Sequence, residues 1–171
     1  GALPDHLFEN ELFGHNKGAF TDASSAEQGL VAEAEGGTLF LDEIDALSPS
    51  AQIKLLRFLQ NGEYRPLGSS RSVLAHVRVI AATNSDLDEK VRLKHFRVDL
   101  FYRLNVLSIE LPALRERGTD VLYLADHFLD LYGNQEGDER LRLSEAARQK
   151  LCNYSWPGNV RELQTVMQRA A

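Results

Sequence analysis

Residues 36–45 read GGTLFLDEID, and this stretch decides the fold class. Its apolar run, residues 38–41, is typical of a buried strand in a parallel sheet. Asp42 and Glu43 follow at the carboxyl end of that strand, the edge at which open α/β sheets bind ligands. One carboxylate can hold Mg²⁺ there while the other polarises a water molecule, which suits a site that hydrolyses nucleotides. The alternative interpretation is a strand followed by an acidic helix cap.

Composition narrows the class of protein. The 171 residues suffice for one domain or one and a half small ones, and 43% hydrophobic with 26% charged residues is typical of a globular chain. The net charge of −6 leaves no basic surplus for a nucleic-acid backbone, so we expect no direct DNA binding by this segment. One cysteine, Cys152, excludes an internal disulfide and fits a reducing cytosol. Without a signal peptide or an apolar run of about 18 residues, the chain is expected to be cytoplasmic, with no membrane contact.

Hydrophobic spacing and turn residues predict alternating helices and strands in the first two thirds of the chain. The expected elements are a helix opening at Pro4 and ending at Gly14, a helix from Ser48-Pro49 to Gly62, a hairpin or surface insertion at 63–76, a strand at 77–82, a helix at 96–104 and a third strand at 107–111. The strand at 77–82 ends in Thr83 and Asn84, again polar residues at a carboxyl edge.

The charged segment 112–118, PALRERG, is flanked by Pro and Gly and predicts a domain boundary. Strands alternate with helices in residues 1–112, whereas residues 113–171 show helical patterns alone. Asn159 and Glu162 resemble a capping box that opens the last helix. The predicted fold is therefore an α/β nucleotide-binding core, a parallel sheet with flanking helices, followed by a C-terminal helical lid.

Six segments resemble, in order, signatures of one family: the AAA+ domain of bacterial enhancer-binding proteins, the sigma-54-dependent transcriptional activators. They are ELFGHNKGAFTDA (11–23), GGTLFLDEID (36–45), VRVIAATN (77–84), FRVDLFYRLNV (96–106), LPALRERGTDV (111–121) and WPGNVREL (156–163). Their order and spacing over nearly the whole chain argue against chance similarity. The resemblance implies a P-loop NTPase that uses ATP and Mg²⁺, assembles into a hexameric or heptameric ring, and remodels sigma-54 RNA polymerase holoenzyme to open promoters.

The resemblance assigns roles to the polar residues at both strand ends. Asp42 and Glu43 match the Walker B pair, in which the first acid supports Mg²⁺ and nucleotide and the second orients and activates water. Asn84, with Thr83 before it, matches the sensor I position, where a short amide can reach the γ-phosphate or the attacking water. The alternative for Asn84 is an Asx turn that leaves the strand.

Three arginines also match family positions. Arg97 and Arg103 match two candidate trans-acting fingers, and a permanently charged guanidinium suits the stabilisation of phosphate charge. On one helix, residues six apart would lie about 240° around the axis, so we do not expect both to touch one phosphate equally. Arg161 matches sensor II, an arginine that reaches from the lid to nucleotide in the same subunit. The alternatives are solvated charges or an intersubunit salt bridge.

Gly18, Ala19, Phe20, Thr21 and Asp22 match the loop that contacts sigma-54, but the sequence reads GAFTDA where the family has GAFTGA. Asp22 replaces a glycine with a charged residue that adopts positive φ less easily. A second hypothesis is therefore a related AAA+ regulator that oligomerises without engaging sigma-54. The aromatic ring in this loop could also simply pack onto the core. Under the resemblance, DNA would be bound only through a domain outside this segment.

The phosphate-binding signature G-x-x-x-x-G-K-[ST] does not occur in the sequence, and the only Gly–Lys neighbours, Lys17-Gly18, stand in the wrong order. In the family this loop lies upstream of the matching segment. We therefore expect that the chain by itself does not hydrolyse ATP. A third hypothesis is an interaction module that retains only the oligomer surface, and a clamp or replication AAA+ protein is disfavoured because it would not need the loop insertion.

Overall fold

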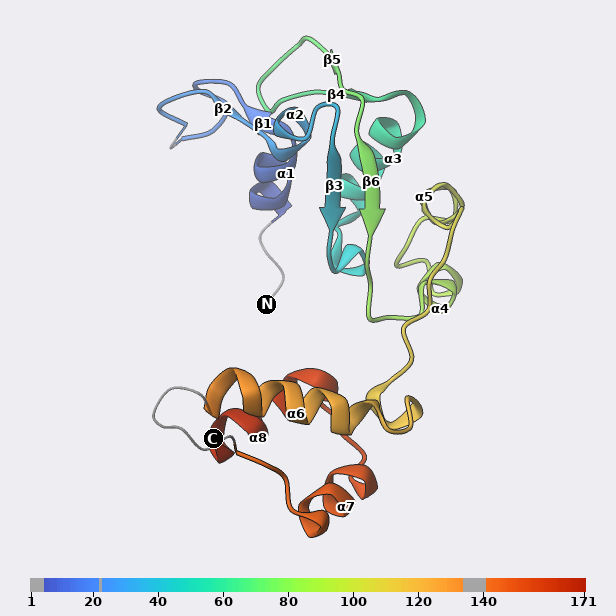
Figure 1. Cartoon of the computed structure of the whole chain (residues 1–171). Helices are drawn as coiled ribbons and strands as arrows, with labels where there is room; N and C mark the ends of the chain where they lie inside the picture. The colour runs from blue at the N-terminus through green and yellow to red at the C-terminus, as the bar shows by residue number, and fades with distance from the viewer. Residues whose placement is uncertain (1–4, 22, 134–140) are drawn as a thin grey trace. The chain divides into compact units, whose positions relative to one another are not determined.

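The computed structural model describes residues 5–21, 23–133 and 141–171 of the chain. The chain divides into two compact units, Gly1–Ser108 and Ile109–Ala171, which we call the core unit and the lid unit. The sequence-based boundary, after residue 112, lies a little beyond this division. The core unit combines helices with a parallel strand pair, and the described part of the lid unit forms helices (Figure 1). The predicted α/β core with a C-terminal helical lid is confirmed.

The core unit begins with a helix and two short strands and ends with two helices. Its elements are α1 (Asp5–Phe13), β1 (Gly14–His15), β2 (Glu27–Gln28), α2 (Leu30–Glu33), β3 (Thr38–Leu41), the 3₁₀ helix η1 (Ile44–Ala46), α3 (Pro49–Asn61), β4 (Glu63–Tyr64), β5 (Val73–Leu74), β6 (Arg78–Ala81), α4 (Leu87–Arg92) and α5 (Val98–Leu104).

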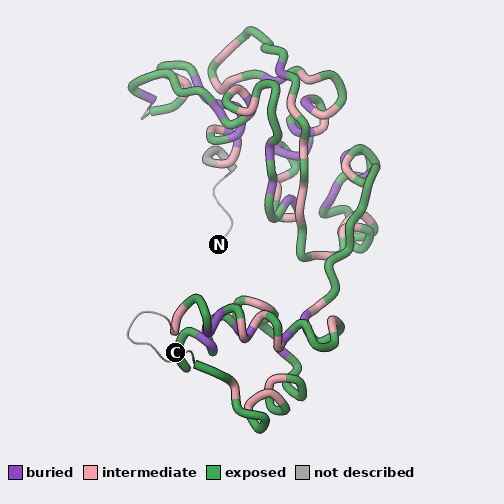
Figure 2. Tube along the Cα trace, viewed as in Figure 1, coloured by how far each residue is buried: buried purple, intermediate pink, exposed green. Residues whose placement is uncertain are grey.

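Strands β3 and β6 pair in parallel, with Phe40 opposite Ile80, so their carboxyl ends reach the same edge (Figure 1). Leu39 and Leu41 are buried against the core, whereas Phe40 is 60% and Ile80 44% exposed on the other face (Figure 2). The apolar run at 38–41 predicted a buried strand. That expectation is corrected because only one face of the pair is covered in the described part of the chain.

Local signals position α3 as predicted. The Ser48 hydroxyl accepts a hydrogen bond from the Ala51 N–H at 3.2 Å, and Pro49 occupies the first helical position. Gly62 ends the helix in the left-handed conformation, with φ +74°. Leu55 and Phe58 are buried on its inner face. Each such buried side chain contributes about 1.5–3 kcal/mol, which fixes the helix beside the strand pair.

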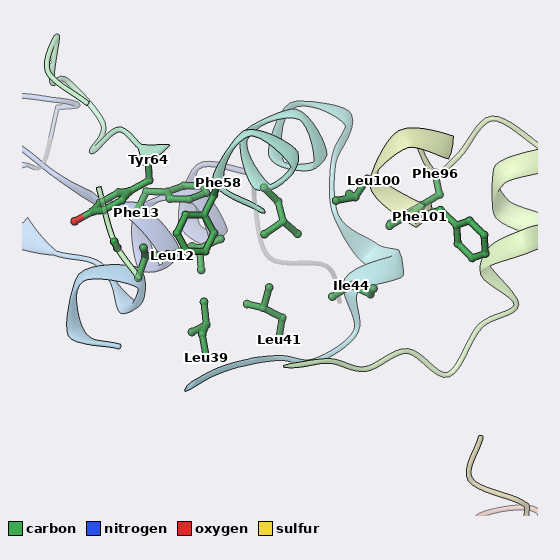
Figure 3. Close-up of a cluster of buried hydrophobic side chains, with 13 residues drawn as sticks. Leu12, Phe13, Leu39, Leu41, Ile44, Phe58, Tyr64, Phe96, Leu100 and Phe101 are labelled. Atoms are coloured by element: carbon green, nitrogen blue, oxygen red, sulfur yellow. The ribbon is translucent and has the colours of Figure 1, made fainter. Parts of the chain in front are cut away.

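The buried side chains of the core unit come from both helices and strands (Figure 3). Tyr64 of β4 packs against Phe13 and Phe58, with ring centroids 6.2 and 6.4 Å away. This aromatic contact anchors the β4–β5 hairpin, whose antiparallel pairing confirms the hairpin predicted at 63–76.

Two loop regions lie together at the amino end of the strand pair, opposite the edge that carries Asp42 (Figure 1). Strands β1 and β2 form one antiparallel ladder and β4 and β5 another. The backbone joins them: Asn16 N–H donates to the Leu67 carbonyl at 2.9 Å, and Leu67 N–H donates to the Gly14 carbonyl at 2.8 Å. The loop after β1 therefore rests on the hairpin.

Two elements differ from the sequence-based expectation. The helix predicted at 96–104 begins at Val98, and Arg97 is its extended N-cap residue because the buried Gln52 side chain accepts the Arg97 N–H at 2.9 Å. The strand predicted at 107–111 is absent from the described structure. Leu107, Ile109 and Leu111 are about four-fifths exposed, and a strand requires a hydrogen-bonding neighbour that this segment does not have there.

The lid unit contains the 3₁₀ helix η2 (Leu114–Glu116), α6 (Asp120–Gly133), α7 (Glu145–Asn153) and α8 (Asn159–Ala170). Trp156 is 3% exposed in its core, and its indole N–H donates to the Leu151 carbonyl at 2.8 Å. This burial anchors the turn before α8.

The capping box predicted for α8 is corrected in part. Glu162 does accept a backbone N–H, but that N–H belongs to Gly158, the N-cap residue, at 2.8 Å. The Asn159 amide oxygen instead accepts the Leu114 N–H at 2.9 Å and so ties η2 to α8. In the described ranges, none of the helices combines the length and apolarity needed to cross a membrane.

Candidate functional site at the carboxyl edge of the strand pair

Asp42 and Glu43 are exposed directly after β3, at its carboxyl end. The Asp42 carboxylate accepts the Glu43 N–H at 2.9 Å. Glu43 adopts the left-handed conformation, with φ +51°, which costs a non-glycine residue about 1–2 kcal/mol. Such strain persists only where neighbouring contacts hold it, and it concentrates at functional sites. The Glu43 carboxylate makes no hydrogen bond or ion pair with described residues and is available to a ligand.

Thr83 and Asn84 follow β6 at the same edge. The Ala82 N–H donates to the Leu41 carbonyl at 2.8 Å, and the Ile44 N–H donates to the Ala82 carbonyl at 3.2 Å. These bonds extend the parallel pairing beyond the strands. The structure therefore brings the two acids, Thr83 and Asn84 to one edge, because parallel strands in register end side by side.

The pKa of Asp45 is perturbed by its surroundings in η1. Its carboxylate accepts hydrogen bonds from the Thr83 hydroxyl at 2.7 Å, the Ser85 hydroxyl at 2.7 Å and the Lys90 ammonium at 2.8 Å. Burial alone would raise the pKa of Asp45, but these hydrogen bonds outweigh it and hold the pKa well below its usual value. Sequence reasoning assigned no role to Asp45, although it is the third acid of the stretch that decides the fold.

Both candidate finger arginines are hydrogen-bonded within the core unit. Arg97 forms a two-point ion pair with Asp99, at 3.0 and 2.7 Å, which holds the pKa of the Asp99 carboxyl below its usual value. Arg103 donates to the Leu59 carbonyl at 3.1 and 2.9 Å and to the Gln60 carbonyl at 3.4 Å. Its guanidinium thus satisfies carbonyls in the last turn of α3. Because Arg97 precedes α5, the helical angle expected between the two arginines does not apply.

Arg161 lies in the first turn of α8 in the lid unit, as predicted, and is exposed. In the described structure its side chain makes no hydrogen bond or ion pair. A free cationic head at a helix start is available to bind an anion.

The predicted contact loop lies at the other end of the core unit. Gly18 has φ +81°, and its N–H donates to the Ala23 carbonyl at 2.9 Å. The Phe20 ring lies 5.0 Å from the ring of the buried His15, yet Phe20 remains 43% exposed. Ala19 and Thr21 flank this ring, and Asp22 lies outside the described residues. The loop therefore presents a partly exposed aromatic side chain.

A cavity of about 710 Å³ opens beside this loop, not beside the acid pair. Phe13, Ala19, Arg57 and the hairpin residues around Tyr64 line it.

The side chains at the acid pair could bind Mg²⁺ only if a ligand such as phosphate supplied further oxygen atoms. Among described residues, no group of three or more His, Cys, Asp or Glu could hold a metal ion. Asp42 nevertheless offers an exposed carboxylate with only one oxygen in a hydrogen bond. One carboxylate completed by phosphate oxygens and water is the usual environment of Mg²⁺ at nucleotide sites, so Asp42 fits the role of a single protein ligand.

Comparison with known proteins identifies relatives along the whole chain. Residues 1–110 match the family model of the Sigma-54 interaction domain, and residues 115–171 match that of an AAA+ ATPase lid domain. The nitrogen fixation protein AnfA of Azotobacter vinelandii is 52% identical over 168 residues, which cover 98% of this chain and 32% of AnfA. The nitric oxide reductase transcription regulator NorR1 of Cupriavidus necator is 56% identical over 170 residues, which cover 99% of this chain and 33% of NorR1. The chain thus spans about a third of the length of these relatives.

Solved structures agree with the family models. NtrX from Brucella abortus superposes with a TM-score of 0.88 at 32% identity, over 98% of this chain and 37% of NtrX. Complexes of NtrX with ADP and with ATP give TM-scores of 0.86 and 0.87. Yeast Hsp104, at 16% identity and a TM-score of 0.66, shares the fold alone. The chain belongs to the sigma-54 interaction domain family of AAA+ proteins, the family of the sigma-54-dependent transcriptional regulators, and carries its α/β core and helical lid.

Proposed function

We propose that this chain is the ATP-hydrolysing module of a sigma-54-dependent transcriptional activator, which remodels sigma-54 RNA polymerase holoenzyme so that promoters open. The carrying observation is the meeting of Asp42 and Glu43 with Thr83 and Asn84 at one edge of a parallel strand pair. Support also comes from the NtrX complexes with ATP and ADP, since NtrX shares this fold at 32% identity. Such a protein works in the cytoplasm, where the polymerase is.

In this proposal each residue at the carboxyl edge of the strand pair has a separate role. Asp42 would hold Mg²⁺, which when bound would supply positive charge to the phosphate oxygens. Glu43, which is exposed and unpaired in the described structure, accepts a hydrogen bond from the attacking water and orients it. Asn84 places an amide beside the γ-phosphate, and Thr83, whose hydroxyl donates to Asp45 at 2.7 Å, supports that position from the preceding residue.

The arginines complete the site from two directions in a hexameric or heptameric ring. Arg161, which is exposed and makes no hydrogen bond or ion pair in the described structure, is the candidate of the lid unit for binding nucleotide. Arg97 and Arg103 are the candidates for the finger supplied by the neighbour, and each must exchange its present partner for phosphate. Asp99 is a side chain on the same short segment, whereas the Arg103 partners are main-chain carbonyls of α3. Release of Arg97 therefore disturbs less structure.

The test is ATP turnover by the complete protein that contains this chain. Glu43→Gln keeps the shape of the side chain and removes its charge, so kcat should fall at least about 100-fold. Glu89→Gln is the matched control, because Glu89 is exposed in the first turn of α4, its side chain is unpaired in the described structure, and turnover should be unchanged. Equal turnover by wild type and Glu43→Gln contradicts the proposal. The 171-residue chain alone should not turn over ATP, since its sequence has no phosphate-binding signature.

The second candidate function is an AAA+ regulator that does not engage sigma-54, and Asp22 in GAFTDA favours it. Binding of purified sigma-54 to the complete protein in the presence of a transition-state analogue of ATP hydrolysis separates the two. Binding that Asp22→Gly does not strengthen supports the activator. ATP turnover without any sigma-54 binding supports the second candidate.

A further inference from the structure

One carboxylate that is largely shielded from solvent connects the two halves of the candidate site. The Asp45 side chain is 10% exposed and meets three donors, from Thr83, Ser85 and Lys90. Lys90 also donates to the Asp45 carbonyl at 3.2 Å. None of these donors is near Asp45 in sequence. They come from the segment after β6 and from α4, so Asp45 spans the gap between the two strand ends.

The placement of the donors determines what Asp45 can do. Thr83 and Ser85 stand on either side of Asn84, and both hydroxyls donate to the same carboxylate. The Ser85 N–H also donates to the Thr83 hydroxyl at 3.1 Å, which tightens the turn between them. Asn84 is thereby held at both of its neighbours, and its exposed side-chain amide oxygen also lies 3.3 Å from the Ser85 hydroxyl.

Asp45 is also close in sequence to Glu43, the acid proposed to activate water. It stands two residues after Glu43, whose left-handed conformation needs support from both sides. On one side the Asp42 carboxylate accepts the Glu43 N–H. On the other side, the side chain of Asp45 and the 3.2 Å bond from Ile44 N–H to the Ala82 carbonyl hold the turn. The side-chain bonds of Asp45 are shorter than this backbone bond.

We propose that Asp45 is a positioning residue that holds the turn bearing Glu43 against the segment bearing Asn84, and so sets the spacing between the activating carboxylate and the phosphate-sensing amide. The inference rests on the proposed function, because it gives Asp45 a role in that ATP hydrolysis. Asp45 itself touches neither nucleotide nor water. Its effect is exerted through geometry, and a misplacement of about 1 Å in catalytic groups can cost about 100-fold in rate.

Kinetics of the complete protein distinguish positioning from binding. Asp45→Ala should lower kcat about 10- to 100-fold, the range found when groups that orient catalytic residues are removed. KM for ATP should change by less than about threefold, since the groups that bind phosphate remain. Asp45→Asn keeps the shape and one acceptor but loses the charge facing Lys90, so its kcat should fall between wild type and Asp45→Ala. Asp88→Asn is the control: this acid of α4 is exposed and unpaired in the described structure.

A double-mutant cycle tests the connection itself. Ser85→Ala removes one donor to Asp45 and should lower kcat severalfold in the wild-type background. In the Asp45→Ala background its effect should be clearly smaller, because the bond to Asp45 is already lost and only the 3.3 Å contact of the Ser85 hydroxyl with the Asn84 amide oxygen remains. Additive losses, or a kcat for Asp45→Ala equal to that of wild type, overturn the inference. Should Asp45→Ala fail to fold, the cycle of Asp45→Asn with Ser85→Ala should still give losses smaller than additive, although Asp45→Asn keeps one acceptor.

Amide hydrogen exchange separates failure of this inference from failure of the proposed function. Asp45→Ala should speed exchange at residues 43–45 and 83–85 together, without nucleotide. One outcome contradicts the positioning role alone: wild type turns over ATP, Glu43→Gln does not, and Asp45→Ala changes neither kcat nor amide exchange. If wild type shows no turnover, the proposed function is wrong and the catalytic role of Asp45 falls with it, even where exchange shows the two segments coupled.

Discussion

The carboxyl end of β3 and β6 is held by polar side chains around the partly buried carboxylate of Asp45, whereas the amino end is held by backbone pairing and aromatic packing. At the carboxyl end Asp45 receives three hydrogen bonds. At the amino end the loops meet through main-chain bonds to Leu67, and Phe20 rests on His15. Charge-assisted hydrogen bonds are directional and hold groups in a fixed geometry. A contact between two rings is weaker, so Phe20 can separate from His15 at a lower cost in free energy.

The largest expected effect is that of a substitution at Phe20, which should impair promoter opening at the amino end more than ATP turnover at the carboxyl end. Phe20→Ala removes the exposed aromatic side chain, and loss of a central aromatic anchor weakens an interface by about 30-fold or more. Promoter opening by the complete protein with sigma-54 holoenzyme should fall accordingly, and at least about tenfold more than ATP turnover falls. Phe20→Tyr keeps the ring and should retain most promoter opening. Equal losses of promoter opening and turnover would show that the two ends cannot be separated.

The next largest effect is the loss of stability expected from a substitution at Gly14. It has φ +73°, and a Cβ there would lie 2.4 Å from the Glu27 carbonyl oxygen of β2. Gly14→Ala therefore adds overpacking to backbone strain and should lower the free energy of unfolding by roughly 2–5 kcal/mol. Gly18 also has positive φ, but a Cβ added there would meet no atom within 4 Å, so Gly18→Ala should cost only roughly 1–2 kcal/mol. Urea denaturation measures both. Equal losses would contradict the close approach of β1 and β2.

A fall in pH should selectively weaken the hydrogen bonds that Asp45 accepts at the carboxyl end of the strand pair. The folded-state pKa of Asp45 lies below its unfolded value, so its stabilisation is present in full above about pH 4 and is lost as the pH falls through the folded-state pKa. Between about pH 4 and 2, wild type should lose on the order of 1–3 kcal/mol that Asp45→Asn has already lost at neutral pH. Denaturation at several pH values measures this difference. Parallel curves for the two proteins, like those expected for wild type and Asp88→Asn, would exclude the effect.

The smallest effect concerns the two arginines. Arg103 hydrogen-bonds the last turn of α3, near the amino end, whereas Arg97 pairs with the exposed Asp99. Arg103→Ala should lower the free energy of unfolding by about 1 kcal/mol, and Arg97→Ala should lower it by a few tenths at most. Thermal unfolding without nucleotide measures both. A larger loss for Arg97→Ala would mean that its ion pair stabilises the core unit more than its exposure suggests.

Elements with local signals were predictable, and elements that depend on distant partners were not. The bounds of α3 follow from Ser48, Pro49 and Gly62, which act within one turn of the chain. The strand expected at 107–111 had the right residues, but pairing depends on a neighbour that local sequence cannot specify. The start of α5 was misjudged because Gln52, more than forty residues earlier, receives the Arg97 N–H.

For the candidate site, the sequence alone determined which groups are present and that two polar strand ends would share an edge, because parallel strands end on the same side. The resemblance to one family and its α/β core and lid were also readable from local motifs. Only the tertiary structure decided that Asp45 binds both neighbours of Asn84, that Glu43 is held in a strained turn, and that Phe20 rests on His15. Such contacts depend on distances between residues remote in the chain, which are set when the helices and strands pack.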